Sequence, residues 1–489
     1  MKKLLSLVAL AGLTLGAASV AMAATDVKVK GTFDFGFGLY QGTSFTKHDG
    51  QENFDASQRF RSQIDFVASE SLKGVARFEI GNLAWGAKGG ATYGWGSNAG
   101  RGVGGAMGAD GVNVEVKNLY LDWVAPQTDL QIRMGVQGYA LPQAVYRAGG
   151  GSGGAVLDDD LAGILLSYDF TEEVGATLGW FRPWNPYVYG DKITRPEQMH
   201  DAIDLVSFTL PIEFKDQFSF TPYFMYAFVG QIGDKYDPQG QGVLTRAGTI
   251  GDFLSANSGL GSNGNAWWTG FALDLSYFKP FVAGVDFMYG SYSADKIEGG
   301  SFNYGDIDPD RSGWAVVSKF GYQLDYFTPV VFGWYGSGSD DFWKKGQDGV
   351  MPVLSPDWGL TSFGFTDVQF AERKYLIGAT PAGTWAIGVG LDDIKFIDNL
   401  TSQLRVAYFE GTSSIKKDNT PVGKNAFMDY GVLGTKDHGF EVNLDNVYKI
   451  YENLSLYAEL GYINLSLKEQ PDDFQKNAFK GYVGFRYSF

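Results

Sequence analysis

Runs of alternating apolar and polar residues recur along most of this chain. In VKVKGTFDFGFGLY, Val27, Phe33 and Leu39 share one face of an extended strand, and Lys28 and Asp34 share the other. QRFRSQIDF and DLQIRMGVQ repeat the same two-residue period, and helical periodicity of any length is missing. The pattern therefore predicts β-strands that each have one apolar and one polar face.

Counting such segments predicts 18 strands, an even number, although a count of 16 follows if two of the weaker segments are loops. The expected strands cover residues 26–40, 58–69, 73–82, 112–125, 129–137, 160–170, 174–182, 201–214, 217–229, 265–279, 281–292, 311–326, 328–336, 383–396, 401–411, 438–449, 453–466 and 476–489.

The connections between these strands alternate between two lengths. Short ones read SES, APQT, TEE, KDQ and FIDNL. Long ones lie at 41–57, 83–111, 138–159, 183–200, 230–264, 293–310, 337–382 and 412–437. Strict alternation places all the short turns at one end of the strands and all the long loops at the other.

The last nine residues, GYVGFRYSF, continue the strand pattern to the final residue, with Tyr487 and Phe489 on the face opposite Arg486. Outer-membrane barrels have an even number of antiparallel strands, short periplasmic turns, long external loops and aromatic girdles. Closing a barrel pairs its last strand with its first. The sequence therefore predicts an all-β transmembrane barrel with both termini periplasmic. A large soluble β-sandwich or β-helix is the alternative fold. It would explain the alternation of apolar and polar residues, but not the strict alternation of short and long connections.

The N-terminus has the pattern of a secretory signal. Lys2 and Lys3 precede an apolar stretch, and Ala21 and Ala23 form an Ala-x-Ala site. We expect cleavage after residue 23, one barrel domain over 24–489, and export to the bacterial outer membrane.

Loss of the two lysines takes the net charge from -16 to -18, which makes nucleic acid an unlikely partner. The absence of cysteine excludes disulfides and thiolate sites.

Several segments also resemble a known family, in the order QRFRSQIDFVASESLKGVARFEIG, KNLYLDWVAPQTDLQIRMGVQGYALP, LDDDLAG, TWAIGVGL, SQLRVAYFEG, YKIYENLSLYAELGYINLSL and GFRYSF. They are similar to the outer-membrane homotrimeric porins of sulfate-reducing bacteria, the Desulfovibrio-type general porins. The resemblance covers nearly all of the expected mature chain and weakens at 230–264 and 337–382. It implies a homotrimer of water-filled barrels, embedded in outer-membrane lipid, for passive diffusion of small hydrophilic solutes and ions.

Three other functions of outer-membrane barrels are a TonB-dependent transporter, an enzyme and a substrate-selective channel. A TonB-dependent transporter needs a plug domain, whereas a strand pattern begins at Val27. Catalysis needs a nucleophile with a base, and His48, His200 and His438 stand in no such motif. We expect no enzyme activity and no cofactor. A substrate-selective channel, for sugars or for organic acids and oxyanions, remains the alternative; a sugar channel needs a continuous ladder of lumen aromatics.

The aromatic pattern favours the general porin, because lumen-phase aromatics such as Tyr40 and Tyr120 are scattered. Five tryptophans are expected at outward or strand-end positions, as a membrane girdle requires: Trp123, Trp180, Trp314, Trp334 and Trp385.

Two connections carry motif-like sequences. Asp306, Asp308 and Asp310 have the spacing of a calcium loop, but Arg311 and Val317 replace the required glycine and glutamate. We take this segment as a solvated acidic loop.

The glycine-rich stretch 86–111 lacks the GK[ST] of a phosphate loop, and we expect it to be an external loop that contacts a neighbouring subunit.

The polar face of the strands predicts the character of the pore. Its basic residues come from neighbouring strands and are Lys28, Lys30, Arg59, Arg61, Arg77, Arg133 and Arg486. The third long connection, 138–159, is expected to fold into the barrel and to bring Asp158, Asp159 and Asp160 opposite this basic wall. Opposed charges of this kind produce a transverse field. Because the basic side is larger, we expect weak anion preference.

Overall fold

The structure is a computed structural model of the whole chain. It describes residues 25–43, 52–85, 114–145, 153–184, 202–214, 218–229, 264–276, 278–294, 310–342, 348–365, 376–419, 426–427, 431–469 and 474–489. The expected signal peptide lies outside these residues.

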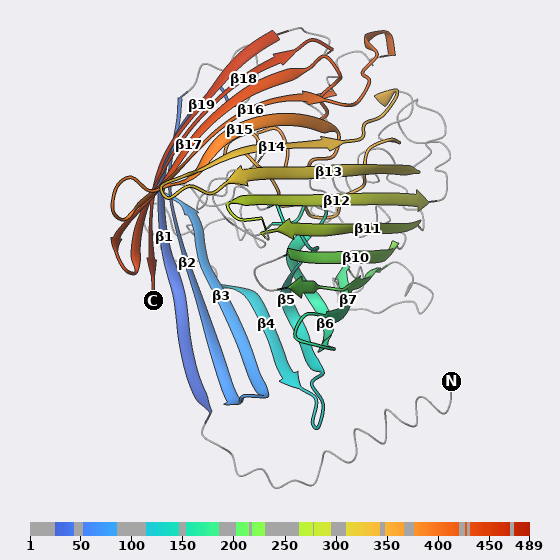
Figure 1. Cartoon of the computed structure of the whole chain (residues 1–489), viewed down its shortest axis with the longest axis vertical. Coiled ribbons are helices and arrows are strands. Elements are labelled where there is room, and N and C mark those ends of the chain that lie inside the picture. The colour runs from blue at the N-terminus through green and yellow to red at the C-terminus, as the bar shows by residue number, and fades with distance from the viewer. Residues whose placement is uncertain are drawn as a thin grey trace, which may run out of the picture.

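The described chain forms one antiparallel β-barrel in which each strand pairs with the next along the sequence (Figure 1). The strands are β1 (Asp26–Gln41), β2 (Glu52–Ser69), β3 (Leu72–Ala84), β4 (Val114–Val124), β5 (Gln131–Ala140), β6 (Asp158–Asp169), β7 (Gly175–Trp184), β8 (Ile203–Thr209), β9 (Ile212–Phe214), β10 (Phe218–Val229), β11 (Gly264–Leu275), β12 (Phe281–Ala294), β13 (Arg311–Tyr322), β14 (Thr328–Gly336), β15 (Thr384–Ile394), β16 (Leu400–Gly411), β17 (His438–Tyr451), β18 (Leu454–Leu467) and β19 (Phe474–Ser488). A short 3-10 helix covers Lys417–Asn419.

The nineteen labelled strands make 18 wall positions, because β8 and β9 are two parts of one strand that both pair with β10. The interruption falls at Pro211, which has no N–H to donate to a ladder. Its carbonyl still accepts the N–H of Gly175, and Leu210 still donates to Pro222, so the wall stays bonded. The predicted 18-stranded barrel is confirmed, and the segment expected at 201–214 accounts for the one broken position.

The ring closes between β19 and β1, which lie side by side in Figure 1. Ten residue pairs join them, from Thr32 with Ser488 to Gln41 with Phe479. Phe489 extends the seam, because its N–H and carbonyl both bond to Gly31, at 3.1 and 3.0 Å. Its ring stacks on Phe60, with 6.3 Å between centroids. The final residue is therefore part of the wall.

The outward face of the wall is apolar. Leu39, Leu121 and Ile387 are about half exposed there or more, as expected for side chains that face lipid. Ring contacts form a belt at the end of the long connections, which we call the external end. The belt includes Trp267–Tyr289, Trp314–Tyr335, Trp385–Tyr408, Tyr408–His438 and Tyr462–Phe479, all with centroids 5.0–5.9 Å apart. In the described residues, no helix has the length and apolar character needed to cross a membrane.

One seam of the wall opens towards the external end. The ladder between β4 and β5 covers only Leu119–Val124 against Gln131–Val136. At the point where the strands part, Gly135 has a φ of 131°, and a Cβ there would lie 2.1 Å from the carbonyl oxygen of Leu119. Asp160 of β6 closes the gap with side-chain bonds, accepting from Lys117 Nζ and Asn118 Nδ2.

The orientation of the barrel can be tested by cysteine labelling. Cysteines at Gln127 and Glu172, which stand in short turns, should be protected from a bulky maleimide added to intact cells. A cysteine in the connection 230–263 should be labelled. Equal labelling of both sets would contradict the orientation of the strands.

Candidate functional site

The connection between β5 and β6 runs inside the barrel. Backbone N–H groups of Ala144 and Val145 donate to the Asp286 carboxylate, at 2.7 and 3.0 Å. Asp286 lies on the inward face of β12, opposite to the face that carries Tyr289 of the external belt. Val145 is fully buried against Gly284, where a side chain would crowd it. Two charge-assisted hydrogen bonds thus fix this connection across the lumen.

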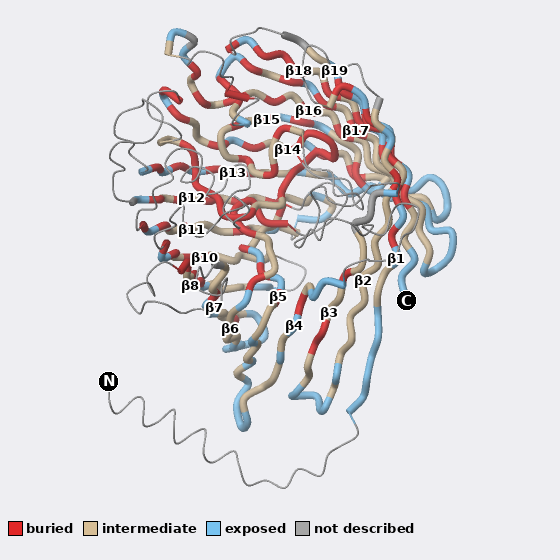
Figure 2. The backbone as a smooth tube through the Cα atoms, turned by 180° about the vertical axis from the view of Figure 1, so that it is seen from behind, coloured by how far each residue is buried: buried red, intermediate tan, exposed pale blue. Residues whose placement is uncertain are grey.

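A second connection, between β14 and β15, also enters the lumen and joins the first. Leu157 and Ser355 form a parallel bridge. Around it, Leu354 and Ser355 donate to the carbonyl of Val156 at 2.9 and 3.2 Å, and Asp158 donates to the carbonyl of Ser355 at 2.7 Å. We call the described parts of these two connections, residues 141–145, 153–157 and 348–365, the inner platform. Figure 2 shows buried stretches of chain within the ring of strands.

Charged side chains of β17 hold the tip of the platform. Phe363 and Gly364 donate their N–H groups to Glu441, at 3.1 and 3.0 Å. Ser362 donates its hydroxyl to Asp445 at 2.8 Å and its N–H to Asn443 at 3.2 Å. Backbone groups that enter a lumen must find partners, because an unsatisfied buried N–H costs about 1–3 kcal/mol.

Two basic residues hold the carbonyl groups of the same tip. Arg405 of β16 donates to the carbonyl of Leu360 at 2.6 Å, and Lys480 of β19 donates to the carbonyl of Ser362. Each is also paired with an acid, Arg405 with Asp392 and Lys480 with Glu459. The tip is therefore bonded to β16, β17 and β19 together.

Apolar packing completes the attachment. Trp358 and Phe365 of the platform pack edge-on against Trp334 of β14, with centroids 5.1 and 4.8 Å apart. Trp334 is 4% exposed, so its predicted outward or strand-end position is wrong. The alternation misleads here because the platform makes the inward face of β14 apolar as well.

Sequence reasoning did not identify the β14–β15 connection as part of the lumen. The available signal was its composition. The stretch VMPVLSPDWGLTSFGF, 350–365, is far more apolar than an exposed loop requires. Such a run in a long connection indicates a segment that packs against the barrel interior.

The basic residues of the predicted wall lie on β1–β5 and β19, and most are paired with acids. Asp34 accepts from both Arg59 and Arg486, at 3.2 and 2.6 Å. Arg61 pairs with Glu79. The other pairs of this wall are Arg133–Asp122 at 2.8 Å, Lys73–Asp122 at 3.6 Å and Lys30–Asp65 at 3.6 Å. Because Asp34 and Asp122 each serve two bases, the wall keeps a positive excess.

Exposure separates the two sides of the lumen. The side chains of Arg133, Arg486 and Arg61 are 37%, 28% and 24% exposed. Those of Arg405 and Lys480, beneath the platform, are 2% and 1% exposed. The tip of the platform therefore covers Arg405 and Lys480, while Arg61, Arg133 and Arg486 stay more open to the lumen. Arg59, beside Asp34, is 11% exposed, and Lys319 on β13 is 26% exposed.

Two predicted constriction residues stand elsewhere on the wall. Lys28 and Lys30 lie near the start of β1, at the end of the short turns, and their side chains are 66% and 63% exposed. Lys28 pairs with Asp26 at 3.8 Å. They line the periplasmic mouth instead of a narrowing, because alternation gives the face of a residue but not its height.

The three predicted acids begin β6 and do not stand opposite the basic wall. Asp160 accepts from Lys117 and Asn118 of β4, and Asn118 is the register partner of Arg77. Asp159 accepts from the hydroxyl of Ser355 in the platform at 2.7 Å. The backbone N–H of Asp158 donates to the carbonyl of the same Ser355. Asp160 thus lies beside the wall, because the strand starts earlier than the sequence pattern indicated.

Other candidate residues fall at the margins. Asp306, Asp308, His48, His200 and the stretch 86–111 lie outside the described residues. Asp310 precedes β13, and the described residues contain no group of three potential metal ligands. His438 stacks on Tyr408 in the external belt, with 5.9 Å between centroids.

Solved structures with a similar arrangement are outer-membrane porins. OpdQ of Pseudomonas aeruginosa aligns with a TM-score of 0.51 and 11% identity, over 95% of this chain and 98% of that one. OpdO of the same organism gives 0.51 and 10%, over 95% and 97%, and OpdL gives 0.50 and 13%, over 95% and 99%. The fold is that of an outer-membrane porin barrel. No protein-family description and no curated protein matches the sequence.

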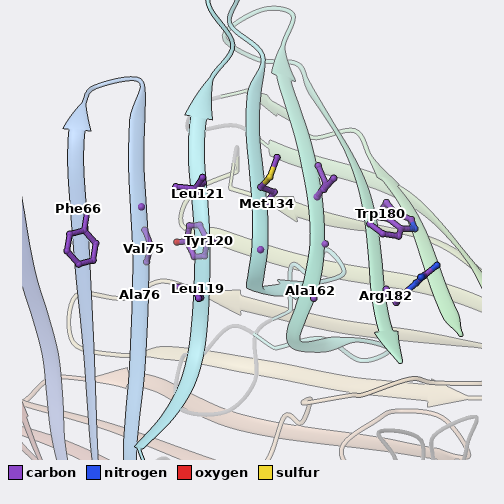
Figure 3. Close-up of a pocket in the computed structure, with 14 residues that line it drawn as sticks. Phe66, Val75, Ala76, Leu119, Tyr120, Leu121, Met134, Ala162, Trp180 and Arg182 are labelled. Atoms are coloured by element: carbon purple, nitrogen blue, oxygen red, sulfur yellow. The ribbon is translucent and has the colours of Figure 1, made fainter. Parts of the chain in front are cut away.

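An apolar pocket of about 580 Å³ lies on the outer surface of this porin-like barrel, over β2–β7 (Figure 3). Its outward lining includes Phe66, Leu119, Leu121, Met134, Ile164 and Trp180. At its edge, Arg182 lies over the Trp180 ring and pairs with Asp204 at 2.7 Å. The pocket faces away from the lumen and is not part of the pore.

Removing the Asp286 carboxylate should release the first part of the platform. We expect Asp286→Ala to lose roughly 1.5–3 kcal/mol per charge-assisted bond and to raise single-channel conductance, because Ala144 and Val145 are no longer held against β12. Asp325→Ala, in an exposed turn, is the matched control. An unchanged conductance in Asp286→Ala would show that this contact does not fix the constriction.

Proposed function

We propose that this chain forms a water-filled channel of the bacterial outer membrane, through which small hydrophilic solutes and ions diffuse passively. The observation that carries the proposal is the one-sided lumen. The platform is bonded to β12, β16, β17 and Lys480 of β19, while exposed charged side chains remain on β1–β5 and at Arg486 of β19. Residues 1–23 would be removed on export.

We also propose weak anion preference. The carboxylates Asp34 and Asp122 each hold two bases, so the exposed side of the lumen has a positive excess. A charged wall facing a low-dielectric platform concentrates counter-ions in the pore. Small oxyanions and organic acids fit this field.

A sugar-selective channel is less well supported. Stacking of sugars needs aromatic rings that the solute can reach. The large lumen aromatics Trp268, Trp334 and Phe332 are at most 4% exposed beneath the platform, and Tyr120 is covered by Arg133, 4.8 Å from its ring centroid. A channel selective for organic acids or oxyanions stays open as the alternative. It would give saturable flux, where a general porin gives flux proportional to concentration.

The selectivity proposal can be tested with a triple variant. Replacing Arg59, Arg61 and Arg133 by alanine should enlarge conductance and shift the reversal potential in a KCl gradient towards cations, because Asp34, Glu79 and Asp122 lose bases. Planar-bilayer recording measures both quantities. The control removes three bases at or near the short turns instead, in Lys279→Ala, Lys395→Ala and Lys449→Ala, the last close to the end of β17. If both triple variants keep the wild-type reversal potential, the wall does not set selectivity.

We further propose that three copies associate, as the resemblance to Desulfovibrio-type porins implies. One observation supports a protein contact on the wall. The aromatic belt is absent from the external ends of β4–β6, where the residues of outward phase are Val114, Val116, Val136, Gly138, Ala140, Asp158, Asp160 and Ala162. Aromatic belts mark the lipid interface, so their absence is typical of a face that lipid does not cover.

Trimer formation should be visible as an oligomer that survives mild detergent and dissociates on boiling. Ala162→Trp places a large ring on the aromatic-free face and should weaken the oligomer, whereas Ile387→Trp, on the lipid-facing side, should not. Deleting residues 88–106 should also weaken it. Light scattering that gives a monomer in mild detergent would contradict the association.

A further inference from the structure

Strand register decides which base of the wall meets an acid. Arg59 and Arg486 both stand opposite Asp34, and Arg61 stands opposite Glu79. Arg133 and Lys73 both stand opposite Asp122. In all five cases the register partners also form the observed ion pair.

Two bases of the wall stand opposite the neutral Gln63: Lys30 still reaches Asp65 at 3.6 Å, whereas Arg77 reaches no acid among the described residues. The register partners of Arg77 are Gln63 on β2 and Asn118 on β4, which are neutral amides. Both amides already donate elsewhere, Gln63 to Asp65 and Asn118 to Asp160, at 2.7 Å each. An amide oxygen is a weaker partner for a guanidinium than a carboxylate.

The nearest acids are also engaged. Glu79 accepts from Arg61, and Asp160 accepts from Lys117 and Asn118. Across the described residues, the Arg77 guanidinium forms no hydrogen bond and no ion pair. It is half-buried on the lumen face, so its donors remain available to a solute on the open side of the platform.

We propose that Arg77 is the binding site for one small oxyanion passing through the pore, so that the channel selects by the one unpaired arginine among the described residues of this wall. This proposal rests on the proposed channel function and names its solute class. The planar guanidinium matches the two oxygens of a carboxylate and also the oxygens of phosphate. Each of the other arginines of the wall already donates to a carboxylate, of Asp34, Glu79 or Asp122, which partly neutralises its charge, whereas Arg77 donates to none of the described carboxylates.

Tyr120 supplies a second group at this site. It lies on the lumen face of β4, two residues from Asn118, and Arg133 covers one side of its ring at 4.8 Å. A tyrosine hydroxyl can donate to an oxyanion held by a neighbouring arginine. The site thus combines one cation with one neutral donor, which gives recognition without the tight binding that would stop flow.

The test is block of KCl current by acetate or by inorganic phosphate in planar bilayers. Both anions should reduce the wild-type current saturably. Arg77→Gln should weaken the block about tenfold, the effect of losing one charge-assisted interaction of about 1.4 kcal/mol. Arg486→Gln is the matched control. It removes the same charge from the same wall but leaves Asp34 paired with Arg59, so its block should stay within about threefold of wild type.

Arg77→Lys separates charge from geometry and serves if Arg77→Gln inserts poorly. It should keep the wild-type reversal potential while weakening acetate block, because an ammonium lacks the bidentate fork. Equal loss of block in Arg77→Gln and Arg486→Gln would overturn the proposal in favour of a collective field. Unblocked wild-type current would overturn it while leaving the channel intact; absence of any wild-type current would instead refute the proposed function.

Discussion

The structure depends on one constraint, which is that every backbone N–H and C=O of a membrane-spanning segment must be bonded within the protein. The chain meets it by closing a ring in which each strand pairs with the next and β19 pairs with β1. Where the ladder fails between β4 and β5, side chains of Lys117, Asn118 and Asp160 replace it. Because the wall is self-sufficient, the long connections are free to enter the lumen without weakening it.

The same requirement acts on the connections once they are inside. Their backbone groups have left water, and each needs a partner from the wall. Asp286 and Glu441 supply carboxylates to N–H groups, while Arg405 and Lys480 supply donors to carbonyls. Charges of β12, β16, β17 and β19 are thus used to hold the platform, whereas the charges of β1–β5 pair with one another and stay on the lumen side of the wall. This division makes the pore one-sided.

Much of the fold was predictable, because alternation with a period of two is set directly by the strand backbone. The final strand, expected at 476–489, is observed at Phe474–Ser488, and the phases of Arg59, Arg61 and Arg133 were assigned correctly. The failures have one cause. Alternation shows that two faces differ, and it carries no information on what enters the lumen or on height along the axis. Trp334 and the β14–β15 connection were missed for the first reason, and the height of Lys28 and Lys30 in the pore could not be assigned for the second.

The central claim is that solutes pass along β1–β5 and not beneath the platform, and thiol modification in an open channel tests it most directly. Gln63→Cys places a thiol on the exposed wall, and Ala407→Cys places one on β16, where Ala407 is 1% exposed. A charged, membrane-impermeant thiol reagent should reduce the single-channel current of Gln63→Cys in discrete steps and leave Ala407→Cys unchanged. Equally fast modification of both cysteines would show that the platform does not close its side of the lumen.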